Sequence, residues 1–209
     1  MAGVWVLDHV AASPFGGTRM GECFTLLGAL AVAFPHVELG PLVLDAAARP
    51  VAVSIAGLET VALVAGARLR IGIGAGPGPG GPFAVERDLL ESPPRSLGER
   101  HARVESLVAG IRSSELLADR SVVIGANSTA LSAVAGRLAD GLNVSVDHPR
   151  RDEFIRAALD AAGDRRIQRS AWARWRPELA DPASPDRRAL TGAGFEALML
   201  AIRPAAPTW

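Results

Sequence analysis

The chain contains no lysine, and it has a single cysteine among its 209 residues. The absence of lysine excludes a catalytic Schiff base and the lysine-containing phosphate loop of P-loop nucleotide-binding proteins. Cys23 has no second cysteine to pair with, so neither a disulfide framework nor a cysteine-based metal cluster is expected. This cysteine usage predicts a location in the reducing cytoplasm.

The sequence also lacks net charge, long apolar runs and a basic N-terminal segment. Its 22 arginines are balanced by 22 acidic residues, so its charge gives no reason to expect nucleic acid or an anionic membrane as a partner. No stretch of about 18 residues is apolar and free of charge, and we therefore expect no membrane span. The first residues, MAGVWVLDHV, have no basic region of the kind that opens a signal peptide.

The remaining composition is that of a globular protein, with 49% hydrophobic and 21% charged residues. We expect one domain spanning residues 1–209. Seven β-like runs alternate with segments of helical character. These runs are residues 4–10, 36–44, 68–76, 121–127, 142–146, 166–175 and 196–202.

The clearest helix begins at the sequence SLGE, where Ser96 and Glu99 form a capping box. Four apolar residues follow with the spacing of one buried helix face: Val104, Leu107, Val108 and Ile111. Alternation of strands with such helices predicts a parallel sheet. An open doubly wound sheet and a (β/α) barrel both fit, and both place function at the carboxyl ends of the strands.

The stretch RLRIGIGAGPGPGG (68–81) contains the letters of a dinucleotide-binding fingerprint in Gly76, Gly78 and Gly81. That fingerprint requires a helix to begin at its last glycine, whereas here prolines interrupt it and no helix follows. We interpret the stretch as a strand whose end approaches a flat ligand closely. A loop over residues 77–95 then covers the mouth of the site.

Several blocks resemble the luciferase-like monooxygenase superfamily in order and spacing, and they are most similar to its branch that depends on the deazaflavin coenzyme F420. The blocks are VWVLDH (4–9), RPVAVSIAGLETVALVAGARLRIGIGAG (49–76), ERHARVESLVAGIR (99–112) and VVIGANSTALSAVAGRLADGLNV (122–144). The resemblance implies a TIM (β/α)8-type barrel in which the seven runs are strands two to eight. The family's first strand and helix are then expected before residue 1, so the chain is expected either to be truncated at its start or to form an incomplete barrel. The exposed strand edges of an incomplete barrel would be covered by a homodimer partner, which we expect, or by a displaced terminus.

Asp8 and His9 end the first run, where polar residues of a barrel indicate function. An imidazole titrates near neutral pH, so His9 can donate or accept a proton while a hydride moves. The resemblance implies that this pair lies beside the cofactor ring, with His9 and Asp8 as the catalytic residues. The alternative is a histidine at a strand end that only caps a loop.

The resemblance also implies cofactor contacts in the second and third runs. It places a cis non-proline peptide at Leu42–Val43, behind the deazaflavin ring; otherwise these are ordinary core residues. Gly74, Ala75 and Gly76 would present their backbone to the ligand. Some relatives carry a general-acid glutamate directly after this glycine, where this chain has Pro77, so a sugar-phosphate dehydrogenase mechanism is not expected.

A further loop precedes a helix and is expected to bind the cofactor phosphate, because a helix N-terminus offers free amides to an anion. Its residues are Gly125, Ala126, Asn127, Ser128 and Thr129. The alternative is an ordinary helix cap. The other three histidines, His36, His101 and His148, are scattered without metal-ligand spacing, and no metal is expected.

Together these observations predict an oxidoreductase that uses coenzyme F420 to transfer a hydride to or from a small organic substrate. Two alternatives stay open. One is an FMN-dependent monooxygenase of the same superfamily, and the other is a non-catalytic flavin-binding relative. No residue pattern indicates the substrate.

Overall fold

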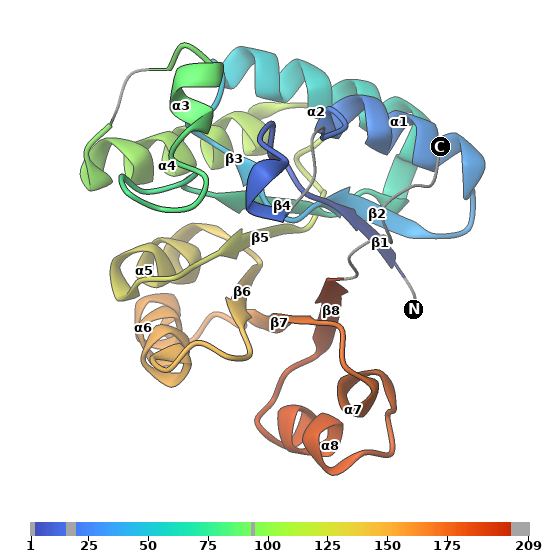
Figure 1. Cartoon of the computed structure of the whole chain (residues 1–209), viewed down its shortest axis with the longest axis vertical. Helices are drawn as coiled ribbons and strands as arrows, with labels where there is room; N and C mark the ends of the chain where they lie inside the picture. Colours follow the sequence, from blue (N-terminus) through green and yellow to red (C-terminus); the bar gives the residue numbers. More distant parts are fainter. Residues whose placement is uncertain (1–2, 16–19, 93–94, 202–209) are drawn as a thin grey trace. The chain divides into compact units, whose positions relative to one another are not determined.

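The computed structural model describes residues 3–15, 20–92 and 95–201. They form two compact units, Met1–Val123 and Ile124–Trp209, shown in Figure 1 in blue to green and in yellow to red respectively. In both units parallel strands alternate with helices, as the sequence predicts. That the chain is a single domain stays a prediction.

The first unit contains two pairs of parallel strands. β1 (Gly3–Val6) pairs with β2 (Glu38–Pro41), and β3 (Leu44–Asp45) pairs with β4 (Ile71–Gly74). The two pairs are linked because the Arg70 amide donates to the carbonyl of Leu39, at 2.9 Å. Among the described residues no ladder joins β2 to β3, so β1 and β2 form a sheet of their own.

One predicted strand is divided in two. The run 36–44 becomes β2 and β3 because residues 42 and 43 leave the ladder between them. The peptide bond between Leu42 and Val43 is cis, as the resemblance implied. Seven predicted runs therefore give eight strands in the described part of the chain.

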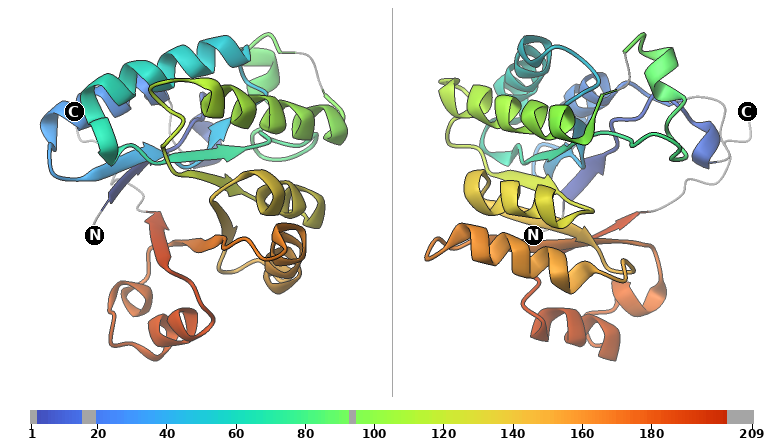
Figure 2. Two further views of the ribbon diagram at one scale, coloured as in Figure 1. Left: turned by 180° about the vertical axis from the view of Figure 1, so that it is seen from behind. Right: turned by 90° about the vertical axis from the view of Figure 1, so that its left-hand side faces the viewer.

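Helices flank the strands of the first unit. They are η1 (Ser13–Phe15), α1 (Cys23–Ala33), α2 (Val51–Ala65), η2 (Gly66–Arg68), α3 (Glu86–Leu89) and α4 (Leu97–Ser113). Helices α1 and α2 lie side by side over the strands (Figures 1 and 2). The four apolar residues that the spacing predicts on one buried face of α4, Val104 to Ile111, are all buried. Strand residues such as Ile71 and Ile73 are buried with them. The apolar core of this unit therefore lies between its strands and its helices.

The segment Val51–Arg68 is long and apolar enough, by length and composition alone, to cross a membrane. A core helix of a soluble protein meets the same criterion. In the structure this segment packs against α1 and α4.

The predicted capping box of α4 is present. The Ser96 hydroxyl accepts from the Glu99 amide, and the Glu99 carboxylate accepts from the Ser96 amide at 2.7 Å. Hydrogen bonds from the Ser96 hydroxyl and amide hold the pKa of Glu99 below its ordinary value of 4.5. The ionised carboxylate is therefore the form that stabilises the folded chain.

This cap predicts a pH dependence of stability. Because the pKa of Glu99 is lowered by folding, its contribution is complete above about pH 4.5 and is lost as the pH falls through the lowered pKa. The difference in unfolding free energy between the wild type and Glu99→Ala should therefore shrink between about pH 6 and pH 3. Denaturant titrations at several pH values measure it. In a Ser96→Ala background the pH dependence of this difference should become smaller, because the hydroxyl is lost while the amide of residue 96 still donates to Glu99. An unchanged pH dependence would contradict the role of the hydroxyl.

In the second unit the strands are again parallel neighbours. β6 (Gly141–Ser145) pairs with β7 (Gln168–Arg174), which pairs with β8 (Ala197–Ala201). β5 (Val122–Gly125) runs from the first unit into the second. The helices are α5 (Thr129–Leu138), α6 (Arg151–Ala162), α7 (Pro177–Ala180) and α8 (Pro185–Gly192). α5 packs closely on α6, since a Cβ at Gly136 would lie 2.2 Å from the carbonyl oxygen of Ala158.

Candidate active site

His9 lies three residues beyond the end of β1 and contacts a buried glutamate. Its Nδ1 atom is 2.9 Å from Oε2 of Glu86, the first residue of the one-turn helix α3. The side chain of His9 is 25% exposed, whereas that of Glu86 is 2% exposed. The pair therefore has its carboxylate in the interior and its imidazole at the surface of the first unit.

The same carboxylate binds the backbone of the turn that carries His9. Its Oε1 atom accepts from the amides of Val10 at 2.7 Å and Ala11 at 2.9 Å. An ionised carboxylate is only an acceptor, so the nitrogen of His9 that faces it, Nδ1, carries a proton. Glu86 thus selects the tautomer whose Nε2 carries the lone pair.

Phe83 fixes the plane of the imidazole. The two rings are stacked, with centroids 3.7 Å apart and planes inclined by 12°. Phe83 and Glu86 both belong to the predicted covering loop 77–95, of which residues 93–94 lie outside the described part. Within the first unit this loop is anchored on His9.

Asp8 has a different environment. Its carboxylate forms a two-point ion pair with Arg49, with N–O distances of 2.7 and 2.8 Å, and it also accepts from the Asp45 amide at 2.9 Å. Asp8 is buried. It joins the end of β1 to β3 and to the residues before α2, so these contacts are those of a positioning residue. A catalytic role for Asp8 stays a prediction.

A third buried carboxylate lies at the end of β3. Asp45 accepts from Arg87 at 3.0 Å and from the amide of Ala47 at 2.7 Å. Burial raises the pKa of Asp45, and the Arg87 guanidinium opposes that rise. Arg87 follows Glu86 in α3, so two neighbouring side chains of this helix bind the ends of two strands.

The structure gives a reason for the glycines of β4 that differs from our interpretation. A Cβ at Gly74 would lie 2.5 Å from a methyl group of Val43, and one at Gly76 would lie 2.3 Å from the Asp45 carboxylate. Gly76 also has a φ of +72°, which favours glycine. Close packing against Val43 and Asp45 therefore requires glycine at positions 74 and 76. Contact of Gly74, Ala75 and Gly76 with a cofactor stays a prediction, as does contact of Leu42 and Val43.

A basic cleft of about 360 Å³ lies beside the Asp8–Arg49 pair. We call it the arginine cleft, and its charged lining residues are Arg49, Arg95, Arg103 and Glu91. Arg103 donates to the carbonyl oxygen of Arg49, yet its Nε is buried without a partner among the described residues. Because Arg49 is already paired with Asp8, Arg95 and Arg103 are the two guanidinium groups of this cleft that could bind an anionic ligand.

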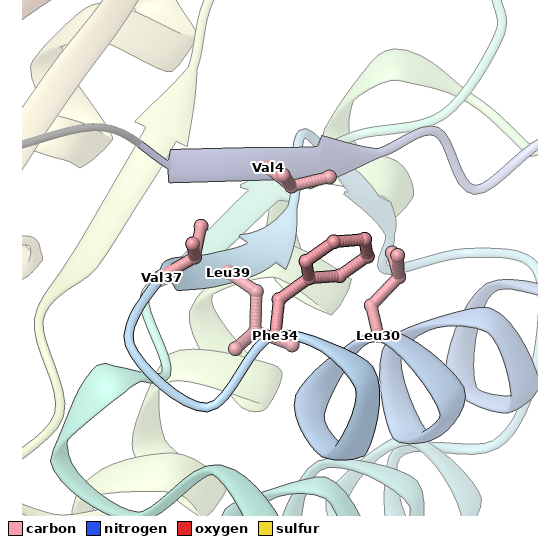
Figure 3. Close-up of a pocket in the computed structure, with 5 residues that line it drawn as sticks. All are labelled: Val4, Leu30, Phe34, Val37 and Leu39. Atoms are coloured by element: carbon pink, nitrogen blue, oxygen red, sulfur yellow. The ribbon is translucent and has the colours of Figure 1, made fainter.

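A second, apolar hollow lies at the other end of the unit. Val4 of β1 and Leu39 of β2 face Leu30 of α1 and Phe34, which is the C-cap of that helix. Val37 completes the lining (Figure 3). This hollow has no polar side chain to orient a ligand, and its residues continue the apolar core to the surface.

The predicted phosphate loop lies in the second unit and is described by itself. Ser128 is the N-cap of α5, and its hydroxyl accepts from the Leu131 amide at 3.3 Å. The Ala126 amide donates to the carbonyl of Asn143 at 2.9 Å. Phosphate binding by Gly125, Ala126, Asn127, Ser128 and Thr129 stays a prediction.

Sequence reasoning missed Glu86, Phe83 and Arg49. A glutamate in a loop rich in glycine and proline carries no pattern of its own, because its partner His9 is 77 positions away. No group of three or more potential metal ligands occurs among the described residues.

The fold is similar to that of several proteins of known structure. No family model and no curated protein matches the sequence. The structure is similar to an F420-dependent secondary alcohol dehydrogenase in complex with an F420-acetone adduct, at 16% identity and a TM-score of 0.66, over 82% of this chain and 60% of that one. It is also similar to the coenzyme F420 dependent tetrahydromethanopterin reductase from Methanopyrus kandleri. That match has 16% identity and a TM-score of 0.62, over 94% of this chain and 68% of the reductase.

A monooxygenase from Streptomyces bottropensis matches at 15% identity and a TM-score of 0.63, over 92% of this chain and 68% of that one. The chain thus spans 60% of the dehydrogenase and about two thirds of the other two proteins. These likenesses confirm the fold class that the sequence resemblance implied, a mostly parallel α/β fold of the TIM-barrel type.

Proposed function

We propose that the chain is a cytoplasmic oxidoreductase that binds coenzyme F420 and transfers a hydride to or from a small organic substrate. The observation that carries the proposal is the His9–Glu86 pair at the carboxyl end of β1. A partly exposed imidazole with one tautomer selected by a buried carboxylate is suited to take a proton from a hydroxyl or return it. Two neighbours in fold are named for F420 and one is a monooxygenase, which supports oxidoreductase chemistry.

The residues of the first unit fit such a cofactor. Coenzyme F420 and FMN both carry anionic tails, and the arginine cleft offers guanidinium groups with an unpaired buried Nε. In this proposal Arg95 and Arg103 hold the anionic part. When bound, the deazaflavin supplies a carbon centre that accepts or gives the hydride.

The other residues act on the substrate and on the backbone. His9 holds or moves the substrate proton at Nε2, since Glu86 binds the proton on Nδ1. Phe83 covers one face of the imidazole and limits the access of water to it. Asp8 binds Arg49 and the amide of Asp45, and these contacts hold the turn before His9 against β3.

The proposal predicts that His9→Ala separates binding from chemistry. The variant should bind oxidised F420 within about threefold of the wild type but reduce it with small alcohols about 10² to 10⁴ times more slowly. Fluorescence titration measures binding, and bleaching of the deazaflavin during alcohol oxidation measures turnover. His101→Ala on α4 is the matched control and should leave both unchanged. Equal loss of binding, turnover and stability in His9→Ala would make His9 structural.

A monooxygenase is the second candidate, because the Streptomyces neighbour is one. Parallel titration with FMN separates the two. Tight binding of FMN alone, with oxygen consumed during turnover, would replace the F420 proposal. If the 209-residue chain binds neither F420 nor FMN, both candidate functions are contradicted for this chain.

A further inference from the structure

Arg95 and Arg103 bring two charges to the arginine cleft that no carboxylate neutralises at close range. Arg95 donates to the carbonyl oxygen of Ala47 at 3.1 Å and to the Ser92 hydroxyl at 2.8 Å. Arg103 donates to the carbonyl oxygen of Arg49 at 2.7 Å. These acceptors are neutral, and neither guanidinium forms an ion pair within the part of the chain that the structure describes. Both charges are therefore available to a ligand.

The amino end of α2 adds to this positive potential. Its N-cap, Pro50, lines the cleft and makes no side-chain hydrogen bond to the helix. The amides of Val53 and Ser54 both donate to the carbonyl oxygen of Pro50, and the first two amides of the helix have no acceptor within it. A helix of 15 residues carries a partial positive charge at this end. The cleft therefore combines two guanidinium groups with a helix amino end, an environment that favours an anion.

Glu91 is the one acidic residue among the described residues that line the cleft, and it has an unusual backbone. Its φ is +49°, the one positive φ of a described residue other than glycine. The Ser92 amide donates to the carbonyl of Arg87 at 2.8 Å, and the Glu91 amide donates to that of Asp88 at 3.1 Å. These are the two bonds of a Schellman motif, whose left-handed residue is usually glycine. A glutamate at this position therefore points to a role for its side chain.

The Glu91 carboxylate takes no part in holding the loop. Its side chain is exposed, and within the described residues it forms no hydrogen bond or ion pair. Glu99 is different, because hydrogen bonds from Ser96 hold its pKa below the ordinary value, and Arg95 contributes to that lowering. The Glu99 carboxylate thus belongs to the cap of α4, whereas Glu91 places its charge at the cleft itself.

The charges of the cleft lining add up to one positive charge. Arg95 and Arg103 contribute two, Glu91 removes one, and Arg49 is neutralised by Asp8. The attraction of a ligand grows in proportion to its charge, whereas the free energy needed to remove it from water grows with the square of that charge. One net positive charge therefore balances a monoanion, and a dianion would be balanced only without Glu91.

We propose that Glu91 makes the arginine cleft selective for a singly charged anion, a carboxylate or a phosphodiester, over a phosphate monoester. A monoester is a dianion above its second pKa of about 6. The cleft volume of about 360 Å³ accommodates such a group together with the part of the ligand attached to it.

This inference deepens the proposed function, and it rests on that function only in naming the cofactor tail as the occupant of the cleft. FMN ends in a phosphate monoester, whereas the anionic groups of coenzyme F420 are a phosphodiester and carboxylates. Glu91 then favours F420 through its tail, independently of the chemistry at His9.

Two small probes at pH 8 test the selectivity without any cofactor: dimethyl phosphate, a monoanion, and methyl phosphate, a dianion. Nitrogen-15 NMR of the arginine side chains follows each titration, and comparison with Arg95→Gln and Arg103→Gln assigns the signals of the cleft. The wild type should bind dimethyl phosphate at least as tightly as methyl phosphate. Glu91→Gln should shift the ratio of the two dissociation constants toward methyl phosphate by about threefold to tenfold at low ionic strength.

Three further variants separate the charge of Glu91 from other changes. Glu91→Gly removes the charge from a backbone that glycine adopts without strain, so it should show the same shift. Glu91→Asp keeps the charge and should keep the wild-type ratio. Asp88→Asn removes an exposed carboxylate of α3 that does not line the cleft, and it should leave the ratio unchanged.

An unchanged ratio in Glu91→Gln, or the same shift in Asp88→Asn, would overturn the proposal. So would titrations in which neither probe perturbs the signals of Arg95 and Arg103, since the cleft would then bind no anion. Failure of F420 binding, with the probe ratios as expected, would contradict only the proposed function. F420 binding with probe ratios that ignore Glu91 would contradict only the role of Glu91.

Discussion

Glu86→Ala is expected to lower the unfolding free energy by about 3 kcal/mol or more, because it leaves two amides without their acceptor at about 1–3 kcal/mol each. Those amides belong to Val10 and Ala11, and the carboxylate they lose is 2% exposed. Chemical denaturation measures the loss. The same substitution removes the partner of His9, so it cannot by itself separate stability from chemistry.

Glu86→Gln makes that separation. Its amide oxygen can still accept from Val10 and Ala11, so most of the stability should remain. Its NH2 group then faces Nδ1 of His9 and donates to it, which moves the imidazole proton to Nε2. Nitrogen-15 NMR of the histidine rings reports this tautomer without any cofactor, and comparison with His9→Ala assigns the signal.

With Nε2 protonated, His9 can no longer accept a proton from the substrate. Turnover by Glu86→Gln should therefore fall by about 10²-fold or more, in the range found when a group that orients a functional histidine is lost. Asp88→Asn changes an exposed carboxylate of the same short helix and is the matched control. A Glu86→Gln variant with wild-type tautomer and turnover would show that Glu86 only anchors the loop.

The sequence was most informative where structure is local. The capping box of Ser96 and Glu99 and the buried stripe from Val104 to Ile111 depend on residues a few positions apart, and both are present. All seven strand runs were found because short apolar runs bounded by turn residues are typical of strands buried in a parallel sheet. The cis bond between Leu42 and Val43 came from the family resemblance alone.

The candidate site depends on contacts between distant residues, and here local patterns carry little information. Glu86 contacts His9 across 77 positions, and Asp8 contacts Arg49 across 41. His9, Asp8 and Arg49 lie in irregular segments and Glu86 begins a helix of one turn, so no periodic pattern predicts these contacts. Glycines are ambiguous for a related reason, since the space above Gly74 could hold a ligand or, as the structure shows, the side chain of Val43.

Breaking the Asp8–Arg49 pair is expected to cause the second large loss of unfolding free energy. Asp8→Ala should lower the unfolding free energy by about 3–5 kcal/mol, because it leaves a partly buried guanidinium without its counter-ion. The Asp45 amide loses its acceptor in the same variant. Glu38→Ala is the matched control: its pair with Arg70 is more exposed, and the loss there should be about 1 kcal/mol or less.

The double variant Asp8→Leu/Arg49→Met tests what the pair does. If its main energetic role is to neutralise two charges in the interior, the double variant should recover most of the stability, because the penalty comes from the unpaired partner. Cofactor binding should nonetheless remain weakened, since the turn before His9 and the wall of the arginine cleft would no longer be held at fixed positions. Denaturation and fluorescence titration on the same samples measure the two effects. A double variant that regains both stability and binding would contradict the positioning role, because a turn held only by apolar packing would then present His9 equally well.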